Sequence, residues 1–338
     1  MSKKNKTPLG IFTESIGLYF SNFDKFVKYM TFPVLGQILG LLLILGITVI
    51  YSQNLPSLLQ KFPNLANVKS LICLSVVVAL PGLAIFTKAF WEYLVAYGAI
   101  NSMFENLYKS GKVYDFNAHT QLIKRRSIPF IALWMLFGIF SLVASFPLFW
   151  VIGAIFTIYF VLIFQAFTFE SDLSPLDCVK KSLSLVKGHF LSTLLLFCLI
   201  GVLTYIFIPQ VVLKIFALVN LNSIIANLFT PISNLVPIND FNIFLKPYGI
   251  PEITVTQINV FFIETIIAQI LIQYTLPMRS ILWALWYKEL DGGAKFHTQV
   301  SGKNKKPSEK LMEASRKKYG KKKLDRNIIE RASKKDEE

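Results

Sequence analysis

The sequence predicts an all-α membrane protein: a polytopic transmembrane bundle of about six spans, with amphipathic helices at the membrane interface in an internal repeat. Three observations predict this class. Hydrophobic residues make up 54% of the 338 residues and charged residues only 16%, whereas a soluble domain carries about 25% charged residues. Six apolar stretches reach the roughly 20 residues that a spanning helix needs. The cations gather outside these stretches.

The order of the predicted spans follows from these apolar stretches. They cover 29–51, 71–90, 127–146, 148–168, 190–213 and 256–277. Helical sequence continues after the second and sixth, to about Tyr108 and Leu290. We therefore expect these two helices to run past the bilayer, or to bend at Pro81 and Pro277.

The connections between spans differ in length. Pro147 separates the third span from the fourth and predicts a tight hairpin there. Residues 214–255, rich in Asn, Pro and Ile, form the longest connection and leave room for a short helix on the outer surface. The membrane domain is thus predicted over 7–290. A basic tail precedes it at 1–6, and a basic tail that we expect to be disordered follows it at 291–338.

The distribution of cations predicts the orientation, because inner loops of membrane proteins are enriched in Lys and Arg. With the N-terminus inside, the outer segments carry few cations: Lys61, Lys69 and Lys246, with Lys214 near the outer end of a span. The inner segments then carry Lys3, Lys4, Lys6, Lys25, Lys28, Lys109, Lys112, Lys124, Arg125, Arg126, Lys180, Lys181 and Lys187. We therefore expect a cell-membrane protein with both termini in the cytoplasm.

An internal repeat relates TPLGIFTESIGLYFSNF (7–23) to SPLDCVKKSLSLVKGHF (174–190). Each stretch begins with an N-cap residue followed by Pro at the first helical position. The apolar residues of the second stretch recur at helical spacing, and its lysines occupy the other faces, which is typical of an interfacial helix. A weaker third copy covers 115–126. The chain therefore reads as three parallel modules, each an interfacial helix followed by two spans.

The segment Glu170–Phe190, ESDLSPLDCVKKSLSLVKGHF, resembles a signature of the membrane domain of glycerophosphodiester phosphodiesterases and of related uncharacterised bacterial multi-pass proteins. The aromatic exit of the last span, at Trp283, Trp286 and Tyr287, is similar as well, although the basic stretch that usually follows is absent. The resemblance covers roughly 7–292 and implies a membrane domain. In that family the phosphodiesterase chemistry belongs to a separate soluble barrel, so hydrolase activity is not carried over.

No catalytic motif, phosphate-binding loop or metal-binding motif occurs in the sequence, so we expect no enzyme activity and no cofactor. His119, His189 and His297 lie in separate segments, and we expect the first two to be solvated polar residues beside interfacial helices. A Ser/His/Asp set brought together by the fold remains open at this stage.

Ionisable residues within or near spans are the candidate site, because such residues are costly in lipid and often functional. Lys88 and Glu92 stand four residues apart near the inner end of the second span. Glu264 and Arg279 fall on one stripe of the sixth, and Glu264 should face the bundle or a wet cavity. Snorkelling, ion pairing and hydrogen bonds between helices are the competing structural roles.

Lysines of the interfacial helix before the fifth span are candidate lipid contacts: Lys180, Lys181 and Lys187. The expected partners are therefore the bilayer, in particular anionic headgroups, and other membrane proteins. We expect a non-enzymatic membrane scaffold or lipid-interacting module. One alternative is a transporter of a small solute or lipid. Another is a membrane biogenesis factor whose basic tail touches lipid or the ribosome, although nucleic-acid binding is otherwise not expected.

Overall fold

The computed structural model describes residues 6–170, 172–234, 238–249 and 251–292. Six helical segments in this part of the chain are long and apolar enough to cross a membrane, and its regular elements are all helices. The prediction of an all-α multi-pass membrane bundle is confirmed. Most of the predicted N-terminal tail, and the C-terminal tail beyond residue 292, lie outside the described residues.

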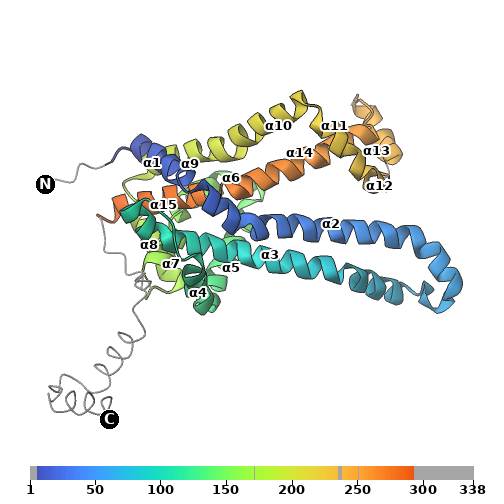
Figure 1. Ribbon diagram of the computed structural model, residues 1–338, viewed down its shortest axis with the longest axis horizontal. Helices are drawn as coiled ribbons and strands as arrows, with labels where there is room; N and C mark the ends of the chain where they lie inside the picture. Colours follow the sequence, from blue (N-terminus) through green and yellow to red (C-terminus); the bar gives the residue numbers. More distant parts are fainter. Residues whose placement is uncertain (1–5, 171, 235–237, 250, 293–338) are drawn as a thin grey trace, which may run out of the picture. The chain divides into compact units, whose positions relative to one another are not determined.

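The helices follow the predicted order closely (Figure 1). The first module contains α1 (Pro8–Phe20), α2 (Phe23–Lys61) and α3 (Val68–Ser110). The second contains α4 (Phe116–Arg125), α5 (Ser127–Ala144), α6 (Trp150–Phe160) and α7 (Ile163–Phe169). The third contains α8 (Pro175–Val186), α9 (Phe190–Gly201), the π-helix η3 (Val202–Phe207), α10 (Ile208–Leu218), α14 (Val255–Tyr274) and α15 (Leu276–Leu290).

Short helical pieces form three of the connections between spans. A 3-10 turn η2 (Pro147–Phe149) joins α5 to α6, as the proline predicted. The connection before α14 contains α11 (Leu221–Ala226), η4 (Asn227–Phe229), α12 (Thr230–Ser233), α13 (Ile238–Leu245) and η5 (Lys246–Tyr248). A further turn, η1 (Pro63–Ala66), joins α2 to α3.

The three short helices α1, α4 and α8 lie at one end of the bundle, opposite the turn between α2 and α3 (Figure 1). We call this the short-helix end. The N-caps are as predicted for two of them: Thr7 accepts from the Gly10 N–H and Ser174 from the Asp177 N–H. The two copies of the repeat also bury side chains at corresponding positions. α1 buries Ile11, Ser15 and Tyr19, and α8 buries Cys178, Ser182 and Val186, which are the matching positions 167 residues later.

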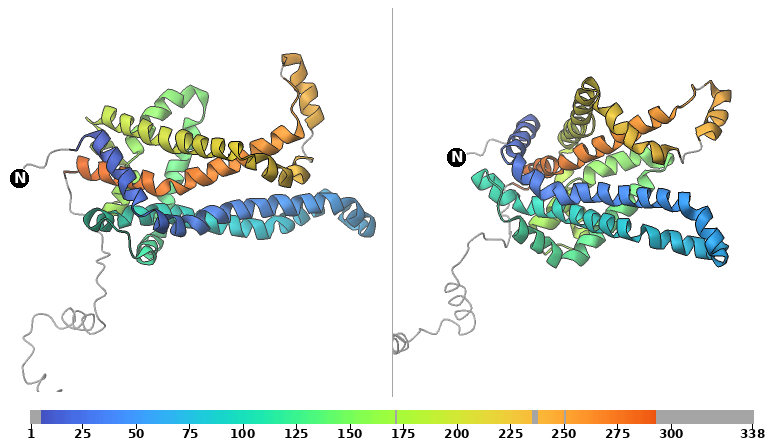
Figure 2. Two further views of the ribbon diagram at one scale, coloured as in Figure 1. Left: turned by 45° about the horizontal axis from the view of Figure 1, so that its top comes forward. Right: turned by 45° about the vertical axis from the view of Figure 1, so that its right-hand side comes forward.

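The hairpin of α2 and α3 is longer than a membrane span. Its helices have 39 and 43 residues, or about 58 and 65 Å at 1.5 Å per residue, against a hydrocarbon core of about 30 Å. The two helices run side by side in both views (Figure 2). α3 continues as one helix through Pro81, so of the two alternatives stated for this span, the extended helix is observed.

Glycines allow α2 and α3 to approach closely. A Cβ built at Gly82 would lie 2.7 Å from the Gly40 carbonyl oxygen, and one at Gly40 would lie 2.6 Å from the Phe86 nitrogen. Small residues at such a crossing let the two backbones pack together, which substitutes for the hydrophobic driving force that lipid does not supply. These contacts fix the pairing of the first module.

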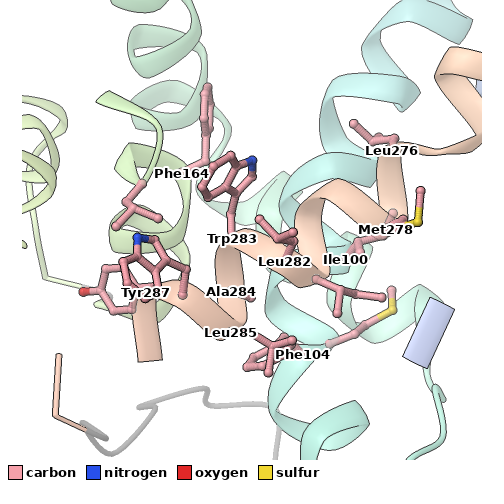
Figure 3. Close-up of a cluster of buried hydrophobic side chains, with 14 of the residues drawn as sticks. Ile100, Phe104, Phe164, Leu276, Met278, Leu282, Trp283, Ala284, Leu285 and Tyr287 are labelled. Carbon is pink, nitrogen blue, oxygen red and sulfur yellow. The ribbon is translucent and has the colours of Figure 1, made fainter. Parts of the chain in front are cut away.

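The last helix, α15, is the centre of the core. Leu282 and Ala284 are fully buried, and α15 packs against Ile100 and Phe104 of α3 (Figure 3). On its other side Trp283 stands beside Phe164 of α7 (Figure 3). α15 therefore joins the second spans of all three modules, and the polar groups described below lie along these contacts.

Candidate functional site

A cavity of about 560 Å³ lies where the three modules meet, with walls from α3, α5, α6, α7, α9, η3 and α15. Most of its wall is aromatic or aliphatic. The aromatic side chains are Tyr93, Tyr97, Trp134, Phe137, Phe160, Phe164, Phe197, Tyr205 and Trp283. Tyr205 and Ile206 at its edge are 52% and 58% exposed, so the cavity reaches the outer, lipid-facing surface of the bundle.

Three interruptions of helical geometry border this cavity. α6 ends and α7 begins around Val161, the π-helix η3 contains Tyr205, and α14 breaks from α15 at Thr275. The Leu162 N–H, freed by the first break, donates to the Ser182 hydroxyl at 3.2 Å. π-helical turns and broken spans leave backbone groups free and are frequent at functional sites. The cavity thus coincides with the least regular part of the bundle.

Arg279 is the cationic residue of the cavity wall. Its guanidinium donates to the Tyr205 hydroxyl and, at 2.9 Å, to the Ile272 carbonyl oxygen. The guanidinium carbon lies 4.8 Å from the centre of the Tyr205 ring. Within the described chain no carboxylate lies within 4 Å of the Arg279 nitrogens, so this charge is met by neutral groups alone.

The depth of Arg279 follows from its position in α15. Glu289 accepts from the Lys6 backbone N–H, and Asp291 pairs with Lys181 at 2.8 Å, so residues 289–291 mark the short-helix end. Arg279 is ten residues earlier than Glu289, or about 15 Å deeper at 1.5 Å per residue. The Arg279 guanidinium also donates to the Ile272 carbonyl, which lies seven residues earlier and therefore further from the short-helix end. Arg279 therefore lies well inside the 36-residue helical segment Val255–Leu290, where a cation that faced lipid would be costly.

A buried polar cluster joins the three modules beside the cavity. Asn101 of α3 accepts hydrogen bonds from Gln165 of α7, at 3.2 Å, and from the Ser280 hydroxyl of α15. All three side chains are fully buried. Each comes from the second span of a different module, so the cluster fixes the mutual packing of these spans. No sequence pattern marked it, because its members are separated by 64 and 115 residues.

Glu264 and Arg279, which the sequence places on one stripe of the last span, have different surroundings. The turn at Thr275 places Glu264 on α14 and Arg279 on α15, although both belong to the one span Val255–Leu290. Glu264 is half-buried, as expected for a residue that faces the bundle, and accepts from the Asn222 amide at 3.2 Å. It does not line the cavity. Arg279 is the predicted residue that does.

Lys88 and Glu92 lie on the outside of α3. Glu92 pairs with Lys124 of α4 at 2.7 Å instead of with Lys88. The exposed Lys88 ammonium lies 5.5 Å from the centre of the Phe32 ring. Both residues border a separate hollow of about 350 Å³ between α2 and α3, so they do not belong to the aromatic cavity.

The three lysines predicted to contact lipid differ in their surroundings. Lys181 pairs with Glu170 at 3.0 Å and with Asp291 at 2.8 Å. Burial alone would lower the pKa of Lys181, but these carboxylates raise it overall. Lys181 thereby fastens α8 to α7 and α15. Lys180 and Lys187 are exposed, and Lys180 lies 3.4 Å from Asp177.

His119 corrects another expectation. It is buried between α3 and α4, and its Nδ1 lies 2.7 Å from the Ser102 hydroxyl. Burial lowers the pKa of His119 to about 4, although Asp115 opposes the shift. The expectation of a solvated residue is therefore wrong for His119, whereas His189 is exposed as expected.

No protein-family model, curated protein or solved structure matches the chain.

Proposed function

We propose that this multi-pass membrane protein binds a membrane lipid, or a lipid-like amphipath, in the aromatic cavity. The observation that carries the proposal is the cavity itself. Its volume of about 560 Å³ lies within the roughly 300–1,000 Å³ of small-molecule sites, and its wall, apolar with few polar groups, is typical of them. Its edge at Tyr205 and Ile206 is exposed where lipid chains surround the bundle.

The binding is proposed to be non-enzymatic, so the protein is a lipid-interacting module or scaffold. The Ser102 hydroxyl and the His119 Nδ1 are close enough for a nucleophile and its base. Both residues are buried, however, and neither lines the cavity, so we assign them no catalytic role. The resemblance to the membrane domain of glycerophosphodiester phosphodiesterases stays a hypothesis about the membrane domain and assigns no hydrolysis.

The proposed location is the cell membrane, with both termini in the cytoplasm. The support is the charge distribution: the segments around α1, α4 and α8 carry most of the loop cations, and the opposite end carries few. In this orientation the exposed Lys180 and Lys187 face anionic headgroups of the inner leaflet. The basic tail at 291–338 is proposed to bind the same surface, each cation contributing about 1 kcal/mol.

Transport of the same amphipath is the second candidate function. The three interruptions that border the cavity favour it, since broken helices at mid-membrane are a recurrent feature of transporter binding sites. Lipid-dependent flux in proteoliposomes distinguishes transport from binding alone.

The binding proposal is tested by filling the cavity. Gly201 lines the cavity, and a Cβ built there meets no atom within 4 Å, so Gly201→Leu adds bulk without forcing a contact at the backbone. Gly138 of α5 is equally free but does not line the cavity, which makes Gly138→Leu the matched control.

The measurement is native mass spectrometry of the purified full-length protein, with identification of the lipid that remains bound. The wild type and Gly138→Leu should retain an amphipath at close to one molecule per chain, and Gly201→Leu should lose it. Equal lipid retention in all three proteins would contradict the proposal.

A further inference from the structure

Resting on the proposed lipid binding, we propose that the cavity selects an anionic amphipath, whose carboxylate or phosphate group binds to Arg279 while its chain lies against the aromatic wall. The inference adds the charge and the chemical class of the ligand. It follows from unmatched donors, from uncompensated charge and from the arrangement of the apolar wall.

Two N–H donors of the cavity residues have no acceptor. The Arg279 Nε–H and the Trp134 indole N–H are both buried without a hydrogen-bond partner in the described chain. Both residues line the cavity. Buried donors are normally satisfied, and each that is not costs free energy. A ligand that supplies acceptor oxygens to these donors would remove that cost.

The charge points to the same ligand class. Arg279 is a cation and lies about 15 Å along α15 from the layer of Glu289 and Asp291. Its observed partners, the Tyr205 hydroxyl and the Ile272 carbonyl, are neutral, and the cavity wall contains no acidic residue. Among the described residues no carboxylate balances this positive charge, so an anionic ligand in the cavity would neutralise it.

Geometry favours a carboxylate or a phosphate. A guanidinium presents planar paired donors that match both oxyanions in two-point contacts. The rest of the wall offers aromatic faces, among them Phe160, Phe164 and Phe197, which suit an alkyl chain. Since Tyr205 contacts Arg279 and also lies at the exposed edge, a lipid entering from the bilayer meets the charged group at the entrance.

The test compares ligands that share a chain but differ in charge. Equilibrium binding of radiolabelled oleate, of dioctanoyl phosphatidate and of neutral monoolein is measured on the full-length protein in neutral phosphatidylcholine nanodiscs. The proteins are the wild type, Arg279→Gln, Arg279→Lys and the cavity-filled Gly201→Leu. Lys88→Gln is the matched control, because Lys88 is also a cation of the bundle but borders a different hollow.

The wild type and Lys88→Gln should bind at least one anion about 10-fold more tightly than monoolein. Arg279→Gln should lose this preference yet still bind monoolein, and Arg279→Lys should retain part of it because the charge remains. Preference for oleate alone identifies a fatty-acid ligand, and preference for phosphatidate alone identifies a phospholipid headgroup.

Several results would overturn the inference. If wild-type protein binds monoolein as tightly as both anions, or if Arg279→Gln keeps the preference, selection by charge at Arg279 is wrong, while lipid binding itself stands. If no probe binds, or if Gly201→Leu binds all of them as the wild type does, the proposed function fails together with the inference.

Discussion

His119 holds α3 and α4 together in its neutral form. Its pKa falls from about 6.5 to about 4 because burial disfavours the charged imidazolium. A lowered folded-state pKa means that the stabilisation is fully present above about pH 6.5 and is lost as the pH falls toward 4. We expect the free energy of unfolding to drop by roughly 2 kcal/mol between pH 6.5 and 4.5.

Thermal unfolding in detergent, followed across this pH range, measures the effect of His119. His119→Gln keeps a hydrogen-bonding group for Ser102 but cannot titrate, so its stability should change much less over the same interval. A wild-type curve as flat as that of the variant would show that His119 is not held neutral.

The hydrogen bond of Glu264 to Asn222 determines how substitutions of Glu264 should affect stability and lipid retention. Glu264 accepts from the Asn222 amide and lies off the cavity. Glu264→Gln retains an acceptor oxygen, so we expect unchanged stability and unchanged lipid retention. Glu264→Leu leaves the amide unmatched and should cost about 1–3 kcal/mol. Loss of bound lipid in a stable Glu264→Gln protein would instead assign Glu264 the functional role considered from the sequence.

The sequence identified a candidate site residue where the free-energy cost of placing that residue in lipid depends only on the composition of its span. Arg279 was a candidate because any charge in an apolar span is expensive, and this reasoning needs no partner. The environments of His119 and Lys181 were not predictable, because they depend on Ser102 and Asp291, which lie on other helices or at their ends and come together with them only in the bundle.

At the scale of elements, the crossing of α2 and α3 depends on Gly40 and Gly82. Because a Cβ at Gly82 would overlap the opposite backbone at 2.7 Å, Gly82→Ala must push the helices apart. We expect a loss of about 1–3 kcal/mol, seen as a lower unfolding temperature. Gly46→Ala on α2 is the control, since its Cβ meets nothing within 4 Å. Equal stability of the two variants would contradict the close crossing.

Most spans were predicted within a few residues, although α2 extends ten residues beyond the predicted end at 51, whereas the interruptions of the later spans were not predicted. Apolar length fixes a span, because every backbone polar group in lipid must be bonded within the helix. Apolar length does not show where a helix is interrupted within its span. The π-helix η3 lies in uninterrupted apolar sequence, and the break before α15 comes at Thr275 rather than at Pro277 itself. Since the cavity is built on these breaks, apolar patterning predicted the bundle but not its cavity.

At the scale of the whole molecule, the proposed orientation predicts which end is accessible from outside the cell. Asn64, between α2 and α3, and Lys187, at the end of α8, are both exposed. On a background without Cys73, Cys178 and Cys198, an impermeant thiol reagent applied to intact cells should label Asn64→Cys and spare Lys187→Cys. The reverse pattern would invert the topology, and permeabilised cells provide the control for reactivity.

Photolabelling addresses most directly whether an amphipath occupies the aromatic cavity. The protein would be incubated in its membrane with a photoreactive long-chain fatty acid or a phospholipid analogue, irradiated, digested and mapped by mass spectrometry. Adducts should concentrate in 157–164, 197–206 and 276–283, which contain most of the cavity wall, and should disappear in Gly201→Leu. Adducts spread evenly over exposed lipid-facing residues such as Leu142 and Leu148, and unchanged in that variant, would contradict the account.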